Sequence, residues 1–100
     1  MDDPYPDLGR ELLAASVGEW AQLVFRGELA DGQARMSLVQ HDPDGTRRSL
    51  RIRDLQRMAK LLQAVRRQTD AVSEGQAEPW TTMVFTFQSD GRFHIDFEYA

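Results

Sequence analysis

The chain has 100 residues, of which 41% are hydrophobic and 28% are charged, and it contains no cysteine. This composition is typical of a globular protein with one modest core, and it excludes a disulfide scaffold, a thiolate metal site and a cysteine nucleophile. The net charge of −4 argues against a general affinity for nucleic acid.

The N-terminal segment, MDDPYPDLGR, is acidic, whereas a signal peptide begins with basic residues and continues with an apolar run. No apolar stretch in the sequence approaches the roughly 20 residues that a transmembrane helix needs. We therefore expect a cytoplasmic protein without a membrane segment, in which residues 1–100 form a single domain.

The first quarter of the chain predicts a helix followed by a strand. Leu8, Leu12 and Leu13 follow helical spacing, and Pro6 is acceptable in the first turn of such a helix. From Trp20 onward the apolar period changes to two, which is typical of a strand with one buried face. The segment ADGQ that follows this strand predicts a tight hairpin turn.

A second alternating segment follows the turn and runs to Val39. The polar segment HDPDGTRRS, residues 41–49, contains Pro and Gly and predicts a loop. Leu50 and Ile52 then predict a short third strand. Asp54 is a candidate N-cap, because its carboxylate can accept a hydrogen bond from the first turn of a helix. The longest helical pattern follows it, at about Leu55–Val72.

The expected order of elements is a helix, two or three strands, a second helix and a closing hairpin. Strands joined by short turns pair antiparallel, and each expected helix has one apolar stripe. The apolar stripes of the helices and the apolar faces of the strands are all buried if both helices lie on one side of the sheet. The sequence therefore predicts an α+β, two-layer fold with a four- or five-stranded antiparallel sheet and two helices packed on one face.

The closing hairpin, in EPWTTMVFTFQSDGRFHIDFEYA, has one apolar and one polar face on each strand. Pairing across the Asp90–Gly91 turn gives an aromatic surface that we expect to face the helices: Met83, Phe85, Phe87, Phe93, Ile95, Phe97 and Tyr99. A slip of one residue would expose this whole surface, so the pattern predicts a firmly set register.

The polar face of the last strand carries Arg92, His94, Asp96 and Glu98. These residues are compatible with a solvated sheet face, a surface for a protein partner, an acid–base pair or a metal site. An acid–base pair needs a pocket that shifts its pKa, and alternate residues of a strand diverge rather than converge on a metal. We therefore predict no catalytic, cofactor-binding or metal-binding residue.

Two further features leave alternatives open. The segment Arg47–Arg67 is rich in arginine, which would suit a small nucleic-acid-binding or regulatory module, but no aromatic side chain interleaves with these arginines to stack on bases. Trp20 and Trp80 stand at the start of expected strands, where each could be buried at the end of the sheet or could anchor an interface.

The closing segment is similar to the C-terminal signature of the YezG-type immunity proteins (antitoxins) of bacterial polymorphic toxin systems. The similar elements are Glu78–Thr81, Met83–Phe87, Gly91–Phe93 and Ile95–Tyr99. The resemblance implies a small cytoplasmic α+β protein that binds and neutralises a cognate toxin, commonly a nuclease. An immunity protein of this kind needs a complementary surface and no catalytic chemistry of its own.

We expect the partner-binding surface to include Trp80, Arg92, His94, Asp96 and Glu98. Many nucleases bind phosphates in a basic cleft, and an acidic sheet face could occupy such a cleft with the help of charge complementarity. The partner would then be a toxin protein rather than nucleic acid or a membrane, and no cofactor would be needed. The exposed edge of the closing hairpin also allows a homodimer.

Overall fold

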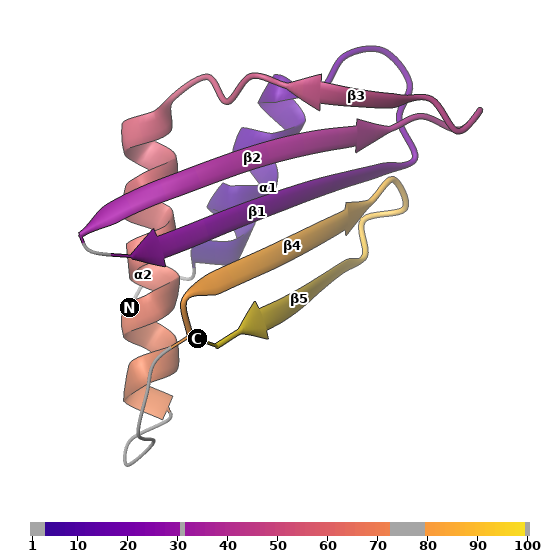
Figure 1. Cartoon of the computed structure of the whole chain (residues 1–100). Helices are drawn as coiled ribbons and strands as arrows, with labels where there is room; N and C mark the ends of the chain where they lie inside the picture. Colours follow the sequence, from indigo (N-terminus) through magenta and orange to yellow (C-terminus); the bar gives the residue numbers. More distant parts are fainter. Residues whose placement is uncertain (1–3, 31, 73–79, 100) are drawn as a thin grey trace.

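The computed structural model describes residues 4–30, 32–72 and 80–99. Its elements follow in the order α1 (Pro4–Ala15), β1 (Gln22–Ala30), β2 (Gln33–His41), β3 (Arg47–Leu50), α2 (Leu55–Val72), β4 (Thr82–Gln88) and β5 (Phe93–Glu98). The five strands found in this part of the chain form one antiparallel sheet with the order β3-β2-β1-β4-β5. Helix α2 lies in the chain between β3, at one edge of the sheet, and β4, which lies beside β1, a strand from which it is distant in the sequence (Figure 1).

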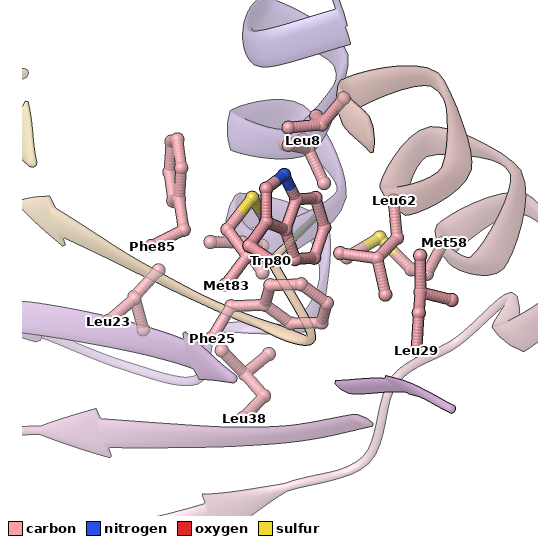
Figure 2. Packing of buried hydrophobic residues seen from close by; sticks show 12 residues of the cluster. Leu8, Leu23, Phe25, Leu29, Leu38, Met58, Leu62, Trp80, Met83 and Phe85 are labelled. Carbon is pink, nitrogen blue, oxygen red and sulfur yellow. The ribbon is translucent and has the colours of Figure 1, made fainter. Parts of the chain in front are cut away.

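Both helices lie on the same side of the sheet, which confirms the predicted α+β class (Figure 1). Alternate residues of the strands project toward apolar residues of the helices and form one core with them (Figure 2). Neither helix in the described ranges is long and apolar enough to cross a membrane. The core members are Leu8, Leu12, Leu23, Phe25, Leu29, Leu38, Met58, Leu62, Val65, Trp80, Met83 and Phe85.

The bounds of α2 agree with those expected from the sequence. The backbone N–H of Arg57 donates to the Asp54 carboxylate at 3.0 Å, so Asp54 is the N-cap of this helix. Met58, Leu62 and Val65 are fully buried and form the stripe that covers the sheet. Burial of this stripe is what holds the helix against the strands.

The third strand lies earlier in the chain than the alternation of Leu50 and Ile52 suggested. It begins at Arg47, because a tight turn between Asp42 and Thr46 returns the chain directly to β2. The N–H of Asp42 donates to the carbonyl of Thr46 at 2.8 Å, and Gly45 takes a positive φ of 91° that suits glycine. The expected loop over residues 41–49 is therefore shorter, and Ile52 lies outside the strand.

The closing hairpin has the predicted register, with Phe85 opposite Ile95 and the apolar faces of both strands directed toward the helices. Gly91 adopts a φ of 92° in the turn and donates its N–H to the carbonyl of Gln88 at 3.0 Å. Coverage by the helices is incomplete, however. Phe93 is 53% exposed, because β5 extends beyond the layer that the two helices form.

Candidate partner-binding surface

The sheet face opposite the helices carries the four polar residues of the closing hairpin that the sequence analysis singled out. The register brings Glu98 of β5 level with Thr82 of β4 and Glu28 of β1, and it brings Asp96 level with Val84 and Arg26. We call this surface the hairpin face and define it by its charged or titratable residues, of which Glu28 is half-buried and the others are exposed: Arg26, Glu28, Arg92, His94, Asp96 and Glu98.

Arg26 and Glu98 form an ion pair across β4, the strand that lies between them. Two guanidinium nitrogens of Arg26 donate to the two carboxylate oxygens of Glu98, each at 3.0 Å. The hydrogen bond and the charge of Glu98 raise the pKa of Arg26. Both side chains are half exposed, so water and salt screen this pair. Because both of its oxygens accept hydrogen bonds from Arg26, the carboxylate of Glu98 is held in one orientation.

His94 and Asp96 form a second pair along the same strand. The Nε2 atom of His94 lies 2.9 Å from Oδ1 of Asp96, and their side chains are 70% and 63% exposed. Since Asp96 turns toward His94 while Glu98 turns toward Arg26, the three side chains do not converge on one point. This geometry suits contact with a macromolecule better than acid–base chemistry or metal binding, both of which need converging groups.

Arg92 lies at the tip of the hairpin and contacts the turn. Its guanidinium lies 2.7 Å from the carboxylate of Asp90, and its side chain is 83% exposed. The backbone N–H of Arg92 also donates to Asp90, and this hydrogen bond lowers the pKa of the Asp90 carboxyl. The two residues thus place a positive and a negative charge together at the outer end of the sheet.

Trp80 does not lie on the hairpin face. It is only 2% exposed, and its indole N–H donates to the hydroxyl of Thr69 at 2.7 Å. The guanidinium of Arg66 lies 5.6 Å from the centre of the ring, which is cation–π distance, and the ring of Phe97 lies 5.1 Å away. Burial was one of the two roles expected for this tryptophan. It supports β5 from the helix side and cannot contact a partner directly.

Charges on the hairpin face are mixed rather than purely acidic. The pairing of β1 with β4 places Arg26 among the carboxylates of β5, and Arg35 lies opposite Glu28 on β2. The apolar period of two that begins at Trp20 places Arg26 on the polar face of its strand. Its approach to Glu98 was missed, because only the strand order, which no local pattern gives, brings β1 beside the hairpin.

The arginine-rich segment 47–67 is partly neutralised within the fold. Arg48 donates to Asp42 at 2.7 Å, and Arg57 contacts Glu11 at 2.6 Å. Arg66 lies over Trp80, as described above. These three arginines, from β3 and from different parts of α2, therefore have partners within the fold, whereas Arg47, Arg51, Arg53 and Arg67 are exposed.

A family model described as "Immunity protein YezG-like" matches residues 1–100. A search of the curated proteins gave no significant match. The family match spans all of the elements described above, including the hairpin that carries the resemblance noted in the sequence. The chain therefore belongs to the YezG-like immunity protein family.

Proposed function

We propose that this chain is a cytoplasmic immunity protein that binds and neutralises a cognate polymorphic toxin, and that residues 1–100 act as one domain without enzymatic activity. The family match over residues 1–100 carries this proposal. The open geometry of the hairpin face supports it, because this face offers exposed, oriented charges and its acidic groups do not converge in a pocket.

The hairpin face is the docking surface in this proposal. Asp96 stands at its centre, between His94 along the strand and the Arg26–Glu98 pair across the sheet. Side chains that are already held by neighbours lose less conformational freedom when a partner binds them. Exposed charges of both signs also select for a partner whose own charges are complementary, which contributes specificity and speeds association.

We further propose that the toxin is a nuclease. A nuclease holds phosphates with cationic groups, and a carboxylate can replace a phosphate oxygen as the acceptor for such groups. The carboxylate of Asp96 is 63% exposed and stands on a strand, so it could enter a cleft without a change in the fold. The toxin would then be blocked at its phosphate-binding site.

The test begins with affinity capture of partners from the source cells, followed by growth rescue. A captured protein with a toxin-like domain should arrest growth when it is expressed alone and should not do so when it is co-expressed with this chain. If the toxin is a nuclease, the purified chain should stop its hydrolysis of nucleic acid at a one-to-one ratio. Recovery of nucleic acid alone, with an affinity that falls steeply with salt, would refute the immunity function.

The docking surface has its own test, which is the double variant Asp96→Asn with Glu98→Gln. We expect it to weaken toxin binding by at least about tenfold and to reduce the dependence of binding on salt. Glu19→Gln is the matched control, since it removes one exposed carboxylate outside the sheet. Unchanged affinity and unchanged salt dependence in the double variant would show that the toxin docks elsewhere.

A further inference from the structure

Among residues 4–30, 32–72 and 80–99, no strand pairs with the outer side of β5, the last strand. It forms the edge of the sheet (Figure 1). The carbonyl groups of Arg92 and Glu98 accept hydrogen bonds from N–H groups on the β4 side. In an antiparallel ladder, the backbone groups of alternate residues point to opposite sides of the strand. Phe93, Ile95 and Phe97 therefore direct their N–H and C=O groups toward the open edge.

This edge lacks several of the features that usually prevent strand addition. The sequence of β5, FHIDFE, contains no proline, glycine or lysine, and its register with β4 is continuous from Thr82–Glu98 to Phe87–Phe93. The opposite edge of the sheet, β3, is only four residues long. Moreover, Phe93, which stacks on Phe85 on the helix side, is 53% exposed, and Tyr99, directly after the strand, is 62% exposed. The β5 edge therefore has outward-pointing backbone groups next to exposed aromatic side chains.

We propose that β5 pairs with β5 of a second copy of this chain, antiparallel and about a two-fold axis at Ile95, so that one sheet continues through both copies. Ile95 lies at the middle of the exposed backbone groups. Pairing there exchanges two hydrogen bonds between the two Ile95 residues, as a two-fold interface requires.

The charges of β5 select this register. With the axis at Ile95, Arg92 lies opposite Glu98 of the second copy, and His94 lies opposite Asp96 of the second copy. The two-fold axis repeats both pairs. Arg92, His94, Asp96 and Glu98 of each copy therefore all face a group of opposite or complementary charge. Opposite charges directly across two strands stabilise their pairing, and like charges destabilise it.

Neighbouring registers do not have this property. Residues whose backbone groups point outward must face outward-pointing residues of the second copy. The two-fold axis must therefore lie at a residue position, and the nearest alternatives to Ile95 are His94 and Asp96. An axis at Asp96 places the two Asp96 carboxylates against each other. An axis at His94 still pairs Arg92 with Asp96, but it places the two His94 rings against each other and leaves Glu98 without a facing residue in the strand, because Asp90 lies in the turn. Charge therefore favours Ile95 over both alternatives.

The helix side of the seam is complementary as well. The same register places Phe93 opposite Phe97 of the second copy, and such aromatic pairs stabilise a sheet. Phe93 already stacks on Phe85 at 5.3 Å and lies 6.2 Å from Tyr5, so its ring is ordered before the second copy arrives. Dimerisation would cover the aromatic surface that the helices leave exposed.

The register is tested by cysteine pairs, since the chain has no cysteine of its own. His94→Cys and Asp96→Cys are prepared separately and then mixed under mild oxidation. Facing residues that do not exchange backbone hydrogen bonds lie at a separation that a disulfide can span. We expect a covalent dimer that contains one chain of each variant, and far less dimer from either variant alone. Equal yields in all three samples would overturn the register.

The dimer itself is tested by sedimentation equilibrium over a range of concentrations. Arg92→Glu places two carboxylates against each other twice per interface, and we expect it to weaken the dimer by about tenfold. Arg53→Glu makes the same change of charge on an exposed residue outside the strands and should leave the dimer intact. A monomer at every concentration would overturn the proposal, as would equal dissociation of the two variants. Neither result depends on the toxin, so this test is independent of the proposed function.

Discussion

Phe85 and Phe93 show how differently the centre and the edge of this sheet are built. Their rings lie 5.3 Å apart and nearly parallel, at 14°, and both project to the helix side. Yet Phe85 is 2% exposed and Phe93 is 53% exposed. The difference comes from the helices, which cover β1 and β4 and cover β5 only in part, with Tyr5 of α1 lying 6.2 Å from Phe93. Alternation in a strand thus determines which face is apolar, and the neighbouring layer determines how much of that face is buried.

The largest effect that distinguishes the two regions should come from truncating these two rings. We expect Phe85→Ala to lower the free energy of unfolding by about 3–5 kcal/mol, because it leaves a cavity in the core. Phe93→Ala should cost only about 1 kcal/mol, since it removes a ring that is already half in water. Urea unfolding of both variants at one low protein concentration measures the difference. Equal losses would mean that the edge carries as much of the stability as the centre.

The tight contact between β1 and α2 gives a second measure of the centre. A Cβ atom at Gly27 would lie 2.8 Å from the side chain of Leu62, which is fully buried. Gly27→Val should therefore overpack the core and lower the free energy of unfolding by about 1–3 kcal/mol. Ser37→Val, on the exposed face of β2, should change it by less than about 0.5 kcal/mol. If Leu62→Ala does not relieve the Gly27→Val loss, the assigned contact is wrong.

The ion pair between Arg26 and Glu98 connects the centre of the sheet to its edge. Both side chains are half exposed, so we expect only a small coupling in a double-mutant cycle of Arg26→Met and Glu98→Gln. The coupling should shrink when salt is added, because screening weakens exposed pairs. A coupling that is large and independent of salt would indicate that the edge strand is held by this pair.

The smallest expected effect appears only in acid. Asp42 accepts hydrogen bonds from the buried Gln40 and from Arg48, each at 2.7 Å, and these bonds lower the pKa of its carboxyl. A carboxyl with a lowered pKa in the folded state stabilises the fold above its unfolded-state pKa. That contribution is lost as the pH falls through the folded-state pKa. Asp42→Asn should therefore be less stable than the parent at neutral pH and equally stable in strong acid. Urea midpoints that stay separated in strong acid would contradict this assignment.

Much of the fold could be predicted from local signals. Asp54 marked the start of α2, and the alternation of β4 and β5 across the turn near Gly91 fixed the register of the hairpin. These features depend on residues that are close in the sequence. The four polar residues of β5 and its turn were also placed on one face, because the period of a strand is two.

Other features depend on contacts between residues that are distant in the sequence, which no local pattern indicates. The approach of Arg26 to Glu98 follows from the position of β1 beside β4, which is set by the path of α2 across the sheet. The exposure of Phe93 follows from the lateral reach of the helices. The start of β3 at Arg47 depends on the geometry of the turn between Asp42 and Thr46. The polar composition of residues 41–49 indicated a loop but did not indicate where it ends.

The place of β4 beside β1 has a consequence for how the chain folds. β1 can form its hairpin with β2 early, because only a short turn separates the two strands. Its second edge stays unpaired until β4 has been synthesised, after β2, β3 and α2. Contacts between residues so distant in the sequence close slowly, since a long loop must be ordered first. We therefore expect the closing hairpin to dock late in folding, and we expect a partly folded chain to aggregate through the bare edge of β1 before that step.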